Sequence, residues 1–200
     1  MDQTDQEHDW LRRLDARAYR GDACVHWSLT MDDRKTGWLI PIFYYKFREL
    51  LTHTMFRYGL CCPIYCCMPD HLHLLWLGLA EGSDQRNAMK YFRRQLNRVL
   101  EKRGAVLQKQ PYDHVLRPDE RQTAAFAAVV EYIARNPERA GLVGPDKYRE
   151  YSFTNCLLPG YPEVTFWQPD FWDRFDRIVS SLRKQGFQRL IADSESGDET

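Results

Sequence analysis

The chain has 200 residues, of which 44% are hydrophobic and 14% aromatic, enough for one globular domain with a full hydrophobic core. It has no run of 18 apolar residues, so the sequence excludes a membrane-spanning helix. The acidic start, MDQTDQEHDW, lacks the features of a signal peptide, and we therefore expect a soluble cytoplasmic protein.

The formal net charge is zero, with 28 basic and 28 acidic side chains, but these charges are unevenly distributed. Residues 1–9 and 193–200 carry four acidic residues each and no Lys or Arg, which leaves residues 10–192 with a net charge of +8. A basic body of this kind favours a polyanionic partner such as nucleic acid. The acidic ends either keep the domain soluble or mask a DNA-binding surface.

The first two predicted elements are a strand and a helix. Residues 24–31 have the composition of a strand, and a turn follows at Asp32. Beyond Pro41, apolar residues recur at helical spacing until Gly59, which is a typical helix stop. We therefore expect a helix between Pro41 and Gly59.

The segments LCCPIYCC and HLHLLWLGL predict two adjacent strands. The first segment contains four of the six cysteines. Strict alternation along a strand puts Cys62 and Cys66 on one face, and Cys61 and Cys67 on the other. This distribution is typical of buried core thiols in a reducing compartment and does not suit four ligands around one zinc ion.

The next predicted helix is strongly basic. Ser83 or Asp84 can cap its start, and Gly104 ends it. Glu101 is its single acidic residue. Such an excess of positive charge favours a DNA-binding helix that contacts phosphates, although a solvated surface helix is the alternative. The predicted DNA-binding residues are Arg86, Lys90, Arg93, Arg94, Arg98, Lys102 and Arg103.

A further strand is expected at KQPYDHVLR, followed by a helix. Asp119 and Gln122 have capping-box spacing, so this helix should begin at Pro118-Asp119 and run to the stop at Asn136-Pro137. The element order is strand, helix, strand, strand, helix, strand, helix. It predicts a ferredoxin-like (RRM-like) α+β fold, an antiparallel sheet with helices on one face and a further helix free to approach the other.

The sequence divides into four parts, without a second domain or an internal repeat. Its composition predicts an acidic N-terminal segment at residues 1–18 and a main domain at residues 19–145. An aromatic C-terminal extension, residues 146–190, is expected to pack on that domain, and residues 191–200 form an acidic tail.

Three polar side chains form a candidate metal site. His71 and His73 are two residues apart in a strand, so both imidazoles lie on one face. Together with the amide oxygen of Asn136, they could bind a divalent ion and leave positions open for water and phosphate oxygens. Because all three ligands are neutral, the ion would keep its charge to polarise a phosphodiester. Alternatively, the histidine pair is structural and Asn136 is a helix cap.

Tyr132 is the candidate nucleophile. It precedes Asn136 by four residues and should project from the same face of one helix. Its phenol has a reference pKa near 10, so an attack on phosphorus at neutral pH needs help from a metal or a base. A phosphotyrosine ester would store the energy of the broken bond for later rejoining. The alternative is a tyrosine packed in the core.

These motifs resemble a known family. MPDHLHLLW, YDHVLR and YIARNPERAGLV occur in that order, and together they resemble the REP-associated tyrosine transposases, single-tyrosine members of the HUH endonuclease superfamily. The likeness extends from Tyr19 to Val143. The chain departs from the family pattern at GAVLQKQP, where the family often has a tryptophan, in a part that concerns hairpin recognition.

The resemblance implies the HUH transposase fold and a DNA strand-transfer activity. It implies recognition of palindromic hairpins in single-stranded DNA, cleavage beside them and rejoining of ends, in association with the nucleoid. His71 and His73 would bind Mg²⁺ or Mn²⁺, and Asn136 would complete the site. Tyr132 would form a 5′-phosphotyrosine and free a 3′-hydroxyl. Relatives act as homodimers or as monomers, and the sequence does not decide between them.

Asp113 and His114 of YDHVLR are weaker candidates. Either could orient a metal-bound histidine, because the second nitrogen of a ligating imidazole usually has a hydrogen-bond partner. Alternatively, they form a structural polar pair at a strand edge.

Two other functions stay open at this level. One is a domesticated, non-catalytic binder of structured single-stranded DNA or RNA. The other is a metal-dependent phosphohydrolase that activates water, for which Tyr132→Phe would keep activity.

Overall fold

The computed structural model describes residues 13–184. The predicted acidic tail at residues 191–200 and residues 1–12 of the predicted N-terminal segment lie outside the described residues. The strands are β1 (Cys24–Thr30), β2 (Leu60–Cys67), β3 (His71–Gly78), β4 (Tyr112–Val115) and β5 (Thr154–Leu157), and the α-helices are α1 (Pro41–Tyr58), α2 (Gln85–Glu101), α3 (Thr123–Ala134), α4 (Asn136–Arg139) and α5 (Phe171–Lys184).

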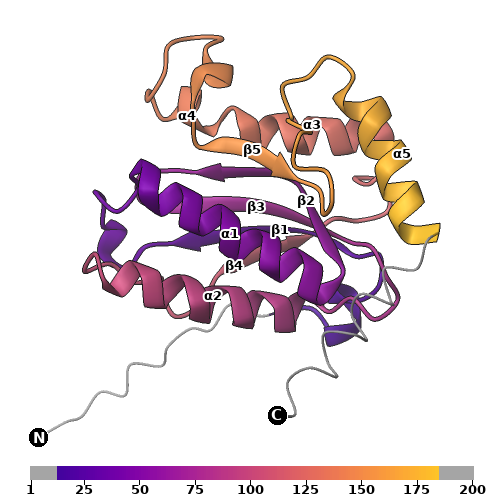
Figure 1. Ribbon diagram of the computed structural model, residues 1–200, viewed down its shortest axis with the longest axis horizontal. Coiled ribbons are helices and arrows are strands. Elements are labelled where there is room, and N and C mark those ends of the chain that lie inside the picture. Colours follow the sequence, from indigo (N-terminus) through magenta and orange to yellow (C-terminus); the bar gives the residue numbers. More distant parts are fainter. Residues whose placement is uncertain (1–12, 185–200) are drawn as a thin grey trace, which may run out of the picture.

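The strands form one antiparallel sheet in the order β4-β1-β3-β2-β5. Helices α1 and α2 cover one face of this sheet, while α3 and α5 cover the other (Figure 1). Two separate hydrophobic cores result, one on each face. The predicted ferredoxin-like α+β fold is thus confirmed, and α5 is added to the face that α3 approaches.

The central strand β3 sends its side chains alternately into the two layers. Leu72, Leu74 and Trp76 are fully buried in the core under α1 and α2. His71 and His73 occupy the alternate positions and therefore face the layer of α3 and α5. The predicted common face of the two histidines is confirmed.

The predicted bounds of α1 and α2 agree with the structure. Gly59 ends α1 in the left-handed conformation, with φ +59°, which a residue without a side chain adopts at little cost. Asp84 caps α2, because its carboxylate accepts a hydrogen bond from the backbone N–H of Asn87 at 3.0 Å. Gly104 has φ +63° just after the end of α2.

The cysteine faces differ from the prediction. Cys62 and Cys67 face the core under α1 and α2, whereas Cys61 and Cys66 face the layer of α3 and α5. The reason is a β-bulge in β2 between Cys61 and Ile64, at Pro63, which has no N–H to donate to the ladder. One extra residue reverses the alternation. All six cysteines are buried free thiols, as expected for core residues.

One further prediction needs correction, and one strand was not predicted. Helix α3 begins at Thr123 and not at Pro118-Asp119, because residues 118–122 form a turn. In this turn, the Glu120 carboxylate accepts the backbone N–H of Arg117, so a local bond takes the place of the predicted capping box. The sequence also gave no sign of β5, which pairs with the edge of β2.

The aromatic C-terminal segment packs on α3, as expected. Phe126 of α3 lies against Trp172 and Phe175 of α5, with ring centroids 5.9 and 6.1 Å apart. Phe171 and Phe175 are buried. None of the helices between residues 13 and 184 combines the length and apolar character required to cross a bilayer.

Candidate active site

The two histidines of β3 lie side by side. Their Nε2 atoms are 3.1 Å apart, and their rings are almost perpendicular, with centroids at 4.8 Å. Both side chains are partly buried. The two nitrogens that could bind a ligand are therefore directed at one point above the sheet.

Each histidine has a partner for its other ring nitrogen. Asp70 lies 2.6 Å from Nδ1 of His71, and because a carboxylate accepts hydrogen bonds, this contact holds the proton on Nδ1 and frees Nε2. Nδ1 of His73 is 2.9 Å from Oγ of Ser28 and 3.1 Å from Nε2 of His26. These three orienting residues were missed from the sequence. Asp70 directly precedes the pair, a signal that could have been used.

The electrostatic environment keeps the inner histidines neutral. Burial, reinforced by the nearby His26, His71 and Arg139, lowers the pKa of His73 to about 3. Burial and His114 lower the pKa of His26 to about 4. At neutral pH both rings are therefore uncharged, and a neutral imidazole is the form that binds a metal.

The geometry of the pair fits a divalent ion. Two ligand atoms each about 2.1 Å from one octahedral ion are about 3 Å apart when they occupy neighbouring positions, close to the 3.1 Å between the Nε2 atoms. Between residues 13 and 184, no three His, Cys, Asp or Glu side chains are grouped to hold a metal. A divalent ion bound by the two imidazoles would therefore take its other ligands from amide, water or phosphate oxygens.

Tyr132 is on the surface, near the end of α3. Its exposed fraction is 54%, which rules out the alternative of a core tyrosine. The guanidinium of Arg139 lies 3.8 Å from the centre of the Tyr132 ring and donates a 2.6 Å hydrogen bond to the Tyr132 carbonyl. Arg139 therefore fixes the position of the phenol, a role that sequence reasoning did not assign to it.

Asn136 is at the start of α4 and not on the same helix as Tyr132. Helix α3 ends at Ala134 because Pro137 has no N–H to donate to the carbonyl of Ile133, and in a continuous helix its ring would clash with that carbonyl. The Asn136 amide group donates to the carbonyls of Tyr132 and Ile133 at 3.3 and 3.0 Å, so it caps α3. Its Oδ1 accepts a hydrogen bond from Arg139 at 3.0 Å.

Arg139 connects the two halves of the candidate site. Its positive charge contributes to the lowered pKa of His73, so it lies within electrostatic range of the histidine pair. In the described part of the chain, the side-chain hydrogen bonds of Asn136 go to α3 and Arg139, and none joins it to His71 or His73. The structure therefore shows no hydrogen-bonding contact between Asn136 and the histidine pair among the described residues.

The two polar residues of β4 point to opposite faces. Asp113 faces the α2 side, where it accepts a 2.5 Å hydrogen bond from Tyr19 and lies 3.4 Å from Arg13. It cannot orient a histidine on the other face. His114 faces the histidine side, but its Nε2 pairs with Glu120 at 2.9 Å. Burial and the Asp113 contact raise the pKa of Tyr19 to about 12.

The seven basic residues predicted to bind DNA lie in different surroundings. Arg94 stacks on Tyr91, with 5.8 Å to the ring centre, and Arg98 donates to the side chain of Gln95 at 3.2 Å. Lys102 and Arg103 line a hollow beside α1. The remaining three, Arg86, Lys90 and Arg93, line a separate cavity near β4.

The comparisons with known proteins give one informative result. No protein-family model matches the chain, and no curated protein matches it. A solved structure of a REP-associated tyrosine transposase bound to a REP hairpin is similar, with a TM-score of 0.58 and 17% sequence identity over 72% of this chain and 79% of that one. At this identity the likeness concerns the fold, and the chain therefore shares the fold of that transposase.

Proposed function

We propose that the protein is a metal-dependent single-stranded DNA endonuclease and strand-transferase that works through Tyr132. It cleaves near hairpins, forms a covalent 5′-phosphotyrosine and rejoins ends. The observation that carries this proposal is the pair of Nε2 atoms of His71 and His73, which are 3.1 Å apart and each held by a hydrogen-bond partner. An exposed tyrosine lies on the same side of the sheet, fixed by Arg139.

The residues of the chain have distinct roles in this reaction. Oη of Tyr132 attacks phosphorus, and the phenol proton passes to solvent. The bond between phosphorus and the 3′ oxygen breaks, and that oxygen takes up a proton from solvent, which leaves a free 3′-hydroxyl and a 5′-phosphotyrosine. Attack of a 3′-hydroxyl on this ester releases Tyr132 and joins two ends. A Mg²⁺ or Mn²⁺ ion held by His71, His73 and Asn136 would supply Lewis-acid polarisation of the phosphate.

Asn136 needs one local change to serve as a ligand. Its Oδ1 has two lone pairs, and one already accepts a hydrogen bond from Arg139. A rotation of the carboxamide would weaken the cap of α3 by about 1 kcal/mol. Such a change is small enough to accompany DNA binding.

Single-stranded DNA with palindromic hairpins is the proposed partner. The similar transposase is bound to a REP hairpin, and the net charge of +8 over residues 10–192 suits a polyanion. The candidate nucleophile is solvent-exposed, as a residue that attacks a large substrate must be.

A cleavage assay tests the proposal. The full chain is incubated with labelled single-stranded oligonucleotides that carry palindromes, either with Mn²⁺ or with EDTA, and the products are separated under denaturing conditions. We expect a metal-dependent adduct one protein mass heavier than the DNA. It should be absent in Tyr132→Phe and in the His71→Ala/His73→Ala double variant. An adduct that persists in either variant refutes the proposal, and cleavage by Tyr132→Phe without an adduct indicates a phosphohydrolase.

A non-catalytic binder of structured single-stranded DNA or RNA is the second candidate. It is favoured by the hydrogen bonds of Asn136, which serve the helix end and Arg139 in place of a metal. Tight binding of several hairpins, with no adduct for any of them in Mn²⁺, would support this function.

A further inference from the structure

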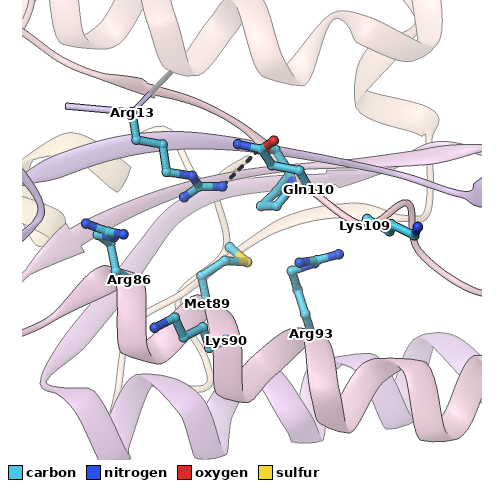
Figure 2. A pocket seen from close by; sticks show the side chains of 8 residues that line it. Arg13, Arg86, Met89, Lys90, Arg93, Lys109 and Gln110 are labelled. Carbon is cyan, nitrogen blue, oxygen red and sulfur yellow. Dashed lines mark hydrogen bonds between the residues drawn. The ribbon is translucent and has the colours of Figure 1, made fainter. Parts of the chain in front are cut away.

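A basic cavity lies on the far side of the sheet from the histidine pair. It has a volume of about 210 Å³ and lies between the N-terminal half of α2 and the segment that leads into β4. Figure 2 shows its charged side chains gathered around one space, with Arg13 opposite the helix. Five basic residues line it: Arg13, Arg86, Lys90, Arg93 and Lys109.

Among residues 13–184, little negative charge compensates the positive charge in this cavity. No acidic residue of the described chain lines it. Arg13 is paired with Asp113 at 3.4 Å, but between residues 13 and 184 no ion pair involves Arg86, Lys90, Arg93 or Lys109. Four cations close together without counter-ions repel one another, so an anion that enters lowers their energy.

Arg93 adds an independent sign of a missing ligand. One of its terminal nitrogens donates to the carbonyl of Gln108. Its Nε is buried and has no hydrogen-bond partner among residues 13–184, and a buried unsatisfied donor is costly unless a ligand binds it. Burial and the nearby Arg13 lower the pKa of Arg93, as expected where positive charges are crowded.

The lining indicates which part of a nucleic acid would fit. The described residues that line it include no aromatic ring on which a base could stack, and Met89 and Pro111 are the apolar ones. Arg86, Lys90 and Arg93 extend along about 10 Å of α2, which is the length of about three stacked nucleotides. The cavity is therefore suited to a charged backbone and not to base recognition.

We infer that this cavity binds the phosphates of a nucleic-acid backbone without sequence preference. One phosphate enters between Arg13 and Arg93, and its neighbours lie along Arg86 and Lys90. The lining residue Pro111 directly precedes β4, an edge strand of the sheet (Figure 1), so a DNA strand held in the cavity can continue around that edge towards the histidine face. This inference deepens the proposed function by naming how the strand is anchored, but it needs neither Tyr132 nor a metal.

Binding measurements with the full chain in EDTA separate this inference from the cleavage activity. The probe is a fluorescent 20-nucleotide single strand of mixed sequence, and affinity is measured by anisotropy over a range of salt concentrations. We expect Arg93→Gln and Lys90→Gln each to weaken binding about tenfold, as for a lost charged hydrogen bond. Each should also reduce the slope of log affinity against log salt by about 0.7.

The matched control is Arg98→Gln. Arg98 is on the same helix and loses the same charge, but it is exposed and away from the cavity. Its affinity should change less than about twofold. An equal loss in Arg98→Gln and Arg93→Gln would overturn the inference, since it would mean a diffuse basic helix. If Arg93→Gln does not fold, the same comparison with Arg98→Gln is made for Lys90→Gln, because Lys90 is exposed.

Two further probes test the ligand class. An oligonucleotide with a neutral methylphosphonate backbone should not bind detectably to the cavity, so Lys90→Gln should have no effect on its affinity. Polyglutamate should compete poorly with the DNA. Equal competition by polyglutamate would point to an acidic protein and overturn the inference. If Arg93→Gln and Lys90→Gln both kept the wild-type affinity for DNA and formed the adduct fully, the inference would be overturned. The proposed function would not be affected by that result.

Discussion

A close backbone approach at the end of β3 leads to a sharp stability prediction for Gly78→Ala. An added Cβ at Gly78 would lie 1.7 Å from the carbonyl oxygen of Gly21 and 2.9 Å from its carbonyl carbon. To reach even 3.0 Å, the two backbone segments must separate by about 1.3 Å. The atoms that the added Cβ would meet belong to the backbone of Gly21, and no flexible side chain can move aside to relieve the contact.

The cost follows from the hydrogen bonds at this crossing. The N–H of Gly78 donates to the carbonyl of Ala23, and the N–H of Gly21 donates to the backbone carbonyl of the buried Ser83, each at 3.0 Å. Loss of both costs about 2 kcal/mol, and strain from overpacking adds about 1–3 kcal/mol. The smaller entropy of the unfolded alanine chain offsets about 0.5–1 kcal/mol. We expect a net loss of about 3 kcal/mol, or about 6–12 °C in Tm for a chain of this size.

Urea denaturation followed by tryptophan fluorescence measures this loss, and calorimetry gives the Tm. Gly82→Ala is the matched control, because an added Cβ there has no atom within 4 Å and the residue is in the neighbouring turn. Its stability should change by less than about 0.5 kcal/mol. If Gly78→Ala lost no more stability than Gly82→Ala, the close approach would not constrain the fold and our reasoning would be refuted.

Three other predictions concern the candidate site and the thiols. Arg139→Gln should slow adduct formation at Tyr132 by about tenfold or more, because the phenol loses the group that positions it. The control is Arg135→Gln, which leaves the contact between Arg139 and the Tyr132 ring intact. Equal rates of adduct formation in the two variants would contradict the role of Arg139. In EDTA, a shift from pH 7.5 to pH 5 should destabilise the protein by about 2 kcal/mol for each of His26 and His73. In the unfolded chain these histidines have a pKa near 6.5 and bind a proton at pH 5. In the folded protein their pKa values are about 4 and 3, so they stay neutral at that pH. Stability therefore falls as the pH falls through 6.5, and His26→Gln should reduce this loss by about half in urea titrations; the same pH dependence in both proteins would exclude His26 as a source. Burial raises the pKa of all six thiols, that of Cys24 to about 12, so iodoacetamide at pH 8 should label none of them in the native protein and all in urea; rapid native labelling seen by mass spectrometry would contradict their burial.

Some parts of the candidate site were predictable because they depend on spacing within one element. Side chains two residues apart on a strand lie on the same face of the sheet, and the rings of His71 and His73 are indeed in contact. Tyr132 and Asn136 are also close, since the Asn136 side chain reaches the Tyr132 carbonyl. Metal binding and the nucleophilic role of Tyr132 stay predictions for the assays above.

Other parts depend on contacts between elements and could not be predicted. The partners of His73 come from β1, which pairs with β3 in a register that places Ser28 opposite His73. Asp113 and His114 are neighbours in the chain, but the pleat of β4 directs them to opposite faces, and the sequence does not say which one faces the histidines. Likewise, α2 has basic residues around much of its surface, and packing decides which of them share a cavity.

By itself, the sequence determined the order of the helices and strands from β1 to α3, the bounds of α1 and α2, and the shared face of His71 and His73. These features follow from backbone geometry and local propensity, which act over a few residues. The tertiary structure decided the reversed alternation at Pro63, the place of β5 beside β2, and the position of Arg139 over Tyr132. Such features depend on register and on packing between distant segments, and no pattern within one segment specifies them.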